Sequence, residues 1–265
     1  MIATFVLRDS ATMLRRQLLH LKRYPLLTIT VIGQPILFLL LFVYVFGGTM
    51  GAGLPGSEGG AGSRTDYLVY ITPGILIMTV ASVAVGSAIS VAIDMTGGII
   101  GRFRTMDISR VAVLTGHVLG ALLRTLLALL VVIAFAFLLG YRSHAGLLDW
   151  SQAFGLLMLL ALALTWLAVG LGLAADGIET ASNTPMFLII LPLVSSAYVP
   201  TDAMPAGLRQ FAEYQPFTPI TDTIRALATG AGPGADLWVA VAWCVLIGLA
   251  GYRWSRRLFL RMPAK

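Results

Sequence analysis

The chain has 265 residues and a net charge of +6, with 58% hydrophobic residues and only 11% charged residues. Four runs of more than 20 residues contain no Asp, Glu, Lys or Arg, and a helix of ~20 apolar residues crosses the ~30 Å hydrocarbon core of a bilayer. The composition therefore predicts an all-α, multi-pass membrane protein and excludes soluble enzymes and nucleic-acid-binding proteins. The positive charge indicates membrane orientation and attraction to anionic lipid.

Residues 1–24 are predicted to form an amphipathic helix that lies in the membrane interface. Leu7, Leu14 and Leu18 recur at helical spacing on one face, and basic residues flank or oppose that face. Such a helix places its leucines among acyl chains and its arginines near lipid phosphates. Pro25 follows, where a new helix can begin without losing a hydrogen bond, so we expect the first span to start there.

The hydrophobic runs predict six membrane spans in a single transmembrane domain that covers residues 1–265. The spans are expected near Leu26–Phe46, Pro73–Ile93, Val118–Leu139, Phe154–Ala174, Thr184–Val199 and Leu237–Trp254. The fifth is short and the sixth is only just long enough, so both require thin bilayer or flanking side chains that reach the interface.

The first two spans each contain a proline. Gln34-Pro35 interrupts the hydrogen-bond ladder of the first span and predicts a kink. Thr72-Pro73 has the form of a helix cap followed by a first helical residue, so the second span is expected to begin there from the outer side. The glycine-rich connection between them, residues 47–65, is predicted to be irregular.

The third hydrophobic stretch, Val111–Leu139, is longer than one span requires. Part of Val111–His117 is therefore expected to project into the cytoplasm, which leaves Arg124 about two turns inside the membrane. Two interpretations of Arg124 remain open. It contacts a transported substrate or gates its path, or it extends toward lipid headgroups.

The distribution of basic residues predicts that both termini are cytoplasmic. Thirteen of the 18 Lys and Arg residues fall before the first span, between the second and third spans, or after the last span. Four fall on the opposite side, and Arg124 lies within a span. Because basic residues accumulate on the cytoplasmic side of membrane proteins, the first set indicates the inner face.

Residues 200–236, between the fifth and sixth spans, are predicted to form an outer helical hairpin. Met204-Pro205 starts one short helix that ends near Tyr214, and Thr218-Pro219 starts another. Both helices are amphipathic, which is typical of a re-entrant or interfacial hairpin; at membrane depth it requires surrounding protein or water.

No motif for nucleotide hydrolysis or metal binding is found in the sequence. Lys22 and Lys265 are the only lysines and neither follows a glycine, so the phosphate-binding Gly-Lys-Ser/Thr sequence is absent. We therefore predict no catalytic residues, no bound cofactor and no metal site in this chain. Asp94 and Asp176 are expected at the cytoplasmic ends of spans, where carboxylates are usually solvated.

The cytoplasmic loop of residues 94–110 is the most informative connection. Ile99, Phe103 and Met106 share one face of a short predicted helix, with Arg102 and Arg104 beside them. A short helix joined rigidly to two spans can dock into a cleft of another protein. The alternative is an interfacial helix that rests on lipid.

The loop sequence Gly-Ile-Ile-Gly-Arg-Phe-Arg-Thr-Met-Asp-Ile-Ser-Arg, which ends at Arg110, resembles the permease subunits of ABC exporters of the daunorubicin-resistance, or ABC-2, type. The outer segment Ser195–Leu227 resembles the same family through Ser-Ala-Tyr-Val-Pro, Gln-Pro, Thr-Pro and Ile-Arg-Ala-Leu. The chain departs from the family pattern at Asp107, where a proline is usual, and at His117, where an arginine is usual.

The resemblance implies an assembly of two permeases and two separate ATP-binding subunits, which bind the ATP and Mg²⁺, in the plasma (inner) membrane of a bacterium. The resemblance implies export of drugs, antibiotics or lipids. Export of lipid-linked glycans is the alternative within the superfamily. An unpowered channel or a membrane-anchored structural protein is the alternative from a different class. The residues that would couple to the ATP-binding subunit are Gly98, Arg102, Phe103, Arg104, Met106, Asp107 and Arg110.

By analogy with that fold, a second copy of the chain or a related permease is expected to pack against the first and fifth spans. Gln34, Ser195 and Ser196, together with Arg124, would then line the path of an amphiphilic substrate, because polar groups in lipid need a partner. The alternative for the serines is a hydrogen bond to their own backbone one turn earlier.

Overall fold

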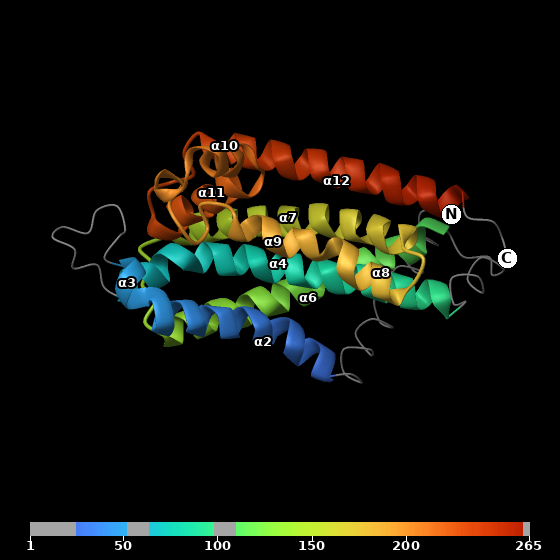
Figure 1. The fold of residues 1–265 in the computed structure, drawn as a ribbon, viewed down its shortest axis with the longest axis horizontal. Helices are drawn as coiled ribbons and strands as arrows, with labels where there is room; N and C mark the ends of the chain where they lie inside the picture. Colours follow the sequence, from blue (N-terminus) through green and yellow to red (C-terminus); the bar gives the residue numbers. More distant parts are fainter. Residues whose placement is uncertain (1–24, 52–63, 98–109, 262–265) are drawn as a thin grey trace.

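The computed structural model describes residues 25–51, 64–97 and 110–261 of the chain, and every regular element in these ranges is a helix (Figure 1). The α-helices are α2 (Pro25–Leu41), α3 (Gly47–Gly51), α4 (Arg64–Thr96), α6 (Arg110–Leu138), α7 (Leu147–Ala174), α8 (Ile178–Asn183), α9 (Phe187–Leu193), α10 (Ala206–Tyr214), α11 (Phe217–Thr229) and α12 (Asp236–Arg261). The π-helix η1 (Phe42–Phe46) follows α2, and the 3-10 helices η3 (Thr184–Met186) and η4 (Thr201–Ala203) flank α9.

Five of the described helical stretches are long and apolar enough to cross a membrane. They are Gly33–Gly51, Arg64–Thr96, Leu114–Leu138, Leu147–Ala174 and Asp236–Arg261. These stretches correspond to the first four and the sixth of the spans expected from the sequence. The predicted all-α class and the membrane-spanning character are thus confirmed.

The predicted fifth span is not one continuous helix. The chain forms α8, η3 and α9 in succession, and the helical path ends at Leu193 rather than at Val199. Pro185 lies in η3 and Pro192 in α9, and each proline removes a backbone donor and crowds the carbonyl four residues earlier. The prediction of a single helix over Thr184–Val199 is therefore wrong in both its start and its end.

The second span begins earlier than Thr72-Pro73 predicted. α4 starts at Arg64 and continues through Pro73. Thr72 does not cap a helix; its hydroxyl donates to the carbonyl of Leu68 at 2.6 Å, within the same helix. A membrane helix tolerates such a proline where neighbouring helices and Ser or Thr side chains satisfy the freed backbone groups. α2 likewise continues through Pro35, and the change of helix type occurs later, at η1.

α4 is the central helix of the bundle. It contacts α2, α6, α7, α8, α9 and α11, and 83% of its most apolar stretch is buried, against 17% for α12. Two close approaches require glycine. A Cβ on Gly172 of α7 would lie 2.5 Å from the carbonyl oxygen of Ala88, and a Cβ on Gly74 would lie 2.7 Å from the Cβ of Ala197. Small residues let membrane helices approach closely in this way.

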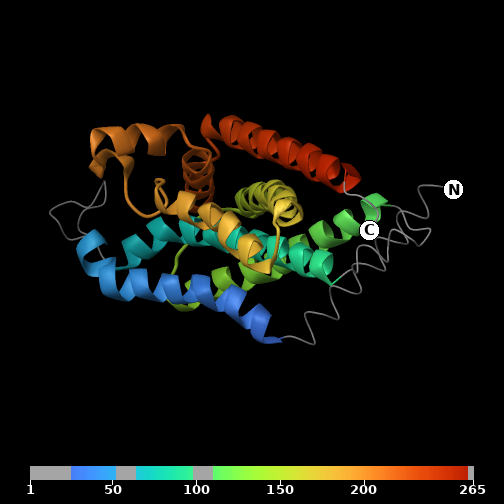
Figure 2. The same ribbon diagram turned by 45° about the vertical axis from the view of Figure 1, so that its right-hand side comes forward.

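The long helices run between two ends of the molecule (Figures 1 and 2). One end, here named the inner end after the predicted orientation, holds Pro25, Thr96, Arg110, Ala174 and Arg261. The opposite, outer end holds α3, the connection between α6 and α7, and helices α10 and α11. α8, η3 and α9 carry the chain from the inner end back toward the outer end, alongside α4 and α7 (Figure 1).

The two helices of the predicted outer hairpin are present as α10 and α11. α10 starts after Pro205 and ends at Tyr214, as the sequence predicts. α11 ends at Gly230, whose φ of 79° is left-handed and suits a residue without a side chain. Their sequence-based assignment as helices is therefore confirmed.

Candidate functional site

The inner end carries the two helices that flank the loop 94–110. Of the expected coupling residues, Gly98, Arg102, Phe103, Arg104, Met106 and Asp107 lie outside the described residues. Arg110 is the first residue of α6. α4 and α6 are continuous helices of 33 and 29 residues that pack against one another. The loop therefore connects two long helices that pack against one another.

A buried acid–base pair joins these helices close to the loop. The Oδ2 atom of Asp94, two residues before the end of α4, lies 3.1 Å from Nε2 of His117 on α6, and both side chains are buried. We name this pair the clasp. Sequence reasoning expected a solvated Asp94 and noted His117 only as a departure from a family pattern. The placement of both residues near the inner ends of consecutive antiparallel spans was the signal that could have paired them.

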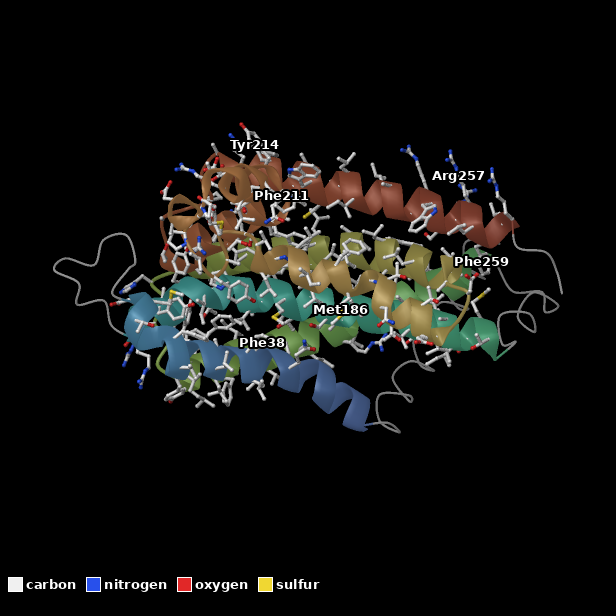
Figure 3. The ribbon with its side chains drawn as sticks, in the orientation of Figure 1. Phe38, Met186, Phe211, Tyr214, Arg257 and Phe259 are labelled. Atoms are coloured by element: carbon white, nitrogen blue, oxygen red, sulfur yellow. The ribbon has the colours of Figure 1, made fainter. Side chains whose placement is uncertain are left out.

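The clasp lies beside an apolar cluster that involves four helices. Val91 of α4, Val118 of α6, Val169 of α7 and Phe259 of α12 are buried together, and Figure 3 shows Phe259 near the inner end of α12. Because side-chain packing of this density transmits displacement, movement of the loop would involve the inner ends of all four helices.

At the outer end, Ser195 and Ser196 are buried between α9 and α10 rather than open to a cavity. The Ser195 hydroxyl donates to the carbonyl of Pro192 at 2.6 Å and accepts from the backbone N–H of Ala197 at 3.1 Å. The Ser196 hydroxyl donates to Oδ1 of Asp222 at 2.7 Å. The bond from Ser195 to the Pro192 carbonyl is the alternative predicted from the sequence, in which the serine bonds to its own backbone. Both hydroxyls have partners within the chain.

Arg225 of α11 holds this segment against α4. Its guanidinium donates to Oδ1 of Asp222 at 2.5 Å and to the carbonyl of Ser196 at 2.7 Å. The guanidinium carbon lies 4.0 Å from the centre of the Tyr70 ring, and the Tyr70 hydroxyl also donates to the Ser196 carbonyl, at 2.9 Å. The Ser196 carbonyl thus accepts one charge-assisted bond from Arg225 and one bond from Tyr70, and the cation–π contact holds the guanidinium against the same tyrosine. Sequence reasoning missed this role.

Further contacts complete the outer cap, by which we mean residues 194–229. Gln215 donates to the carbonyl of Val194 at 2.6 Å, and Thr218 donates to the carbonyl of Ala212 at 2.5 Å. Tyr198 packs on Phe42 with ring centres 5.0 Å apart and so connects the cap to η1. The outer cap is therefore one hydrogen-bonded unit in contact with the first and second spans.

The outward side of α10 is apolar. Leu208, Phe211 and Tyr214 are exposed, and Figure 3 shows Phe211 and Tyr214 projecting from the outer end. On the same helix Arg209 pairs with Glu213 at 2.7 Å and with Asp202 at 2.8 Å. The hydrogen bond that Arg209 donates to Glu213 and the two negative charges raise the pKa of Arg209. An amphipathic helix of this kind suits a membrane interface.

The remaining predicted path residues, Gln34 and Arg124, lie at membrane depth on different helices. Gln34 is exposed on α2. Arg124 is only partly exposed, and its Nε donates to the carbonyl of Gly120 at 3.3 Å. Arg124 is the midpoint of α6, 14 residues or roughly 21 Å from either end. The predicted depth of about two turns inside the membrane stays a prediction.

Comparison with known proteins gives one family. Residues 9–228 match the ABC-2 type transporter family. The daunorubicin resistance ABC transporter permease protein DrrB1 of Streptomyces coeruleorubidus is 30% identical over 241 residues, 90% of this chain and 80% of that protein. The doxorubicin resistance ABC transporter permease protein DrrB of Mycobacterium tuberculosis is 28% identical over 169 residues, 63% of this chain and 54% of that one. The matched range includes the loop 94–110 and most of the outer hairpin.

Proposed function

This chain belongs to the ABC-2 type transporter family, and we propose that it is the permease of an ATP-driven exporter that moves amphiphilic compounds out of the cytoplasm or the inner leaflet. The single observation that carries the proposal is the family match over most of the chain, supported by the relative that is named for daunorubicin resistance. The drug, antibiotic or lipid identity of the substrate belongs to the proposal.

The energy source is a separate subunit. The sequence has no Gly-Lys-Ser/Thr loop with which to hold nucleotide phosphates, so ATP and Mg²⁺ would be bound by two copies of an ATP-binding partner. That partner would dock beneath the loop 94–110 through Gly98, Arg102, Phe103, Arg104, Met106, Asp107 and Arg110. The continuous helices α4 and α6, joined by the clasp, support this role because they extend from the loop through the bundle.

The chain crosses the bacterial inner membrane six times, with α8, η3 and α9 together as the fifth crossing. These elements cover 16 residues, Ile178–Leu193, or roughly 24 Å of helix. This is shorter than an average hydrocarbon core, and a local thinning of the bilayer would accommodate it. Both termini are cytoplasmic, and α10 and α11 form an interfacial hairpin on the outer side.

Two permease copies associate through the first and fifth crossings. The described parts of these crossings expose large apolar side chains, among them Leu37 and Val45 of the first and Met186 and Ile190 of the fifth. Gln34 and Arg124 would face the substrate path between the copies. Ser195 and Ser196 would enter that path only after their bonds within the outer cap open.

The test uses the permease reconstituted with its ATP-binding subunit and a panel of fluorescent amphiphiles that includes daunorubicin. Phe103→Ala, or Arg102 and Arg104 to Glu, should lower ATP-driven efflux at least roughly tenfold while the permease stays inserted, because the loop no longer engages its partner. Phe137→Ala on the exposed side of α6 and Arg142→Glu at the outer end are matched controls. Normal efflux by the loop variants contradicts the coupling role, and efflux without nucleotide favours an unpowered channel.

A further inference from the structure

We propose that Arg124 is a binding site, at membrane depth, for the acidic group of an anionic amphiphile, either a phosphate or a carboxylate. The inference rests on the proposed function, because an exporter of amphiphiles brings such groups into contact with its spans. It adds the charge class of the ligand, which neither the fold nor the family match gives.

The position of Arg124 makes its charge costly. The residue lies at the centre of α6, and ten residues, roughly 15 Å of helix, separate it from the inner end of the apolar stretch at Leu114. A charged side chain at this depth is costly unless it is paired or reaches water. Arginines in spans therefore usually have an acidic or carbonyl partner.

Arg124 lacks an acidic partner among the described residues. Its Nε is bonded to the Gly120 carbonyl, and its Nη2 atom is buried without a hydrogen bond. α2 and α6 contain no acidic residue, and the acids of α4 and α7 lie within three residues of a helix end. A second copy of the chain carries the same acids at the same helix ends. Because no acid of the described helices lies near the middle of α6, we infer that the anion that pairs with Arg124 comes from a bound ligand.

The surroundings of Arg124 favour a polar ligand. Ala121 and Ala128, one turn on either side of Arg124, pack against Val83 of α4, so the helices are separated there only by small side chains. The hydroxyl of Thr125, the residue after Arg124, is buried without a hydrogen-bond partner. This hydroxyl can donate to an acidic oxygen once the surrounding helices separate slightly.

The chemistry of the guanidinium selects the ligand class. Its two Nη groups donate in parallel to two oxygens of a carboxylate or phosphate, and the bond is strongest where water is excluded. A cationic headgroup is repelled by the same charge, and a neutral one gains only an ordinary hydrogen bond. A bilayer phospholipid and a transported amphiphile share the acidic oxygen, so the test has to separate these two sources.

The experiment measures binding without ATP, so its failure is distinct from a failure of ATP-driven transport. The permease complex is placed in nanodiscs of zwitterionic phosphatidylcholine. Binding of a labelled lysophosphatidic acid is compared with that of the monoacylglycerol of the same chain length. We expect the acidic probe to bind at least roughly tenfold more tightly, as for a charge-assisted hydrogen bond. Equal affinities in the unaltered protein overturn the proposal.

Variants test whether Arg124 carries this preference. Arg124→Gln should weaken binding of the acidic probe until the two affinities lie within roughly twofold of one another, and Arg124→Lys should keep part of the preference. Arg142→Gln, at an exposed arginine of the outer end, is the matched control. A preference that survives in Arg124→Gln overturns the proposal.

A second membrane identifies the source of the acid. In nanodiscs with phosphatidylglycerol, a bilayer lipid that occupies the site should abolish the preference for the acidic probe. In that case native mass spectrometry should detect phosphatidylglycerol bound to the unaltered protein but not to Arg124→Gln. A preference that persists in this membrane assigns the site to the transported amphiphile. Phosphatidylglycerol bound equally to both proteins, with no probe preference in either membrane, contradicts the site.

Discussion

At the scale of single residues, two arginines of the outer cap show how burial decides what a charged side chain contributes. Arg225 is largely covered and bonds to Asp222 and to the Ser196 carbonyl. Arg209 makes two ion pairs on the exposed surface of α10. Exposed pairs contribute little to stability because water and salt screen them, whereas a covered, charge-assisted network leaves unsatisfied groups when one member is removed.

Arg225→Ala should therefore destabilise the protein by about 1–3 kcal/mol, because the Ser196 carbonyl and Asp222 lose a charged donor. Arg209→Ala is the control, since it removes two acidic contacts against one for Arg225, and it should leave stability unchanged within error. Thermal unfolding of the two purified variants in the same detergent makes the comparison. Equal loss of stability in the two variants would contradict this account of the cap.

The sequence predicted that some of these residues are functional, but it did not predict the groups to which they bond. It named Ser195 and Ser196 because polar groups in a span need partners, and it included the backbone bond that Ser195 makes. The bond of Ser196 to Asp222 crosses 26 residues, and no local pattern predicts a contact of that separation.

At the scale of elements, proline had different consequences in different helices. Pro35 and Pro73 lie inside helices that continue, whereas Pro185 lies in η3, which divides the predicted fifth span, and Pro192 lies one residue before the end of α9. Local helix propensity predicts an interruption at each of these prolines. The difference between the helices therefore comes from the packing around them. The two helices of the outer hairpin were predictable because their start signals and amphipathic spacing are local.

The clasp connects the two elements that flank the loop 94–110, and a double-mutant cycle can measure it. Asp94→Asn and His117→Gln should each lower thermal stability, because each leaves a buried polar partner unsatisfied. The double variant should be more stable than the two single losses predict, with a coupling energy of about 1 kcal/mol. Additive losses would show that the two side chains act independently.

At the scale of the whole molecule, the positions of the helix ends are the main support for the proposed membrane topology. α2 starts and α12 ends at the same end of the bundle (Figure 1). Five crossings would place these two points on opposite sides of a membrane. Whether the number of crossings is even therefore depends on the divided segment α8–α9, which would bring the number to six. The sequence predicted the number of hydrophobic runs and the bias of basic residues, but it could not show that one run is divided.

The most direct measurement is the membrane topology of the full chain in cells. Reporters active only outside the cytoplasm are fused after Gly53, Arg104, Gly177, Gly232 and Lys265, with expression of each fusion as the control. Six crossings with a cytoplasmic loop 94–110 predict activity after Gly53 and Gly232 and none at the other three positions. Activity after Arg104 would contradict the account, because the loop would then lie on the wrong side of the membrane from any ATP-binding subunit. Activity after Lys265 would contradict the six crossings.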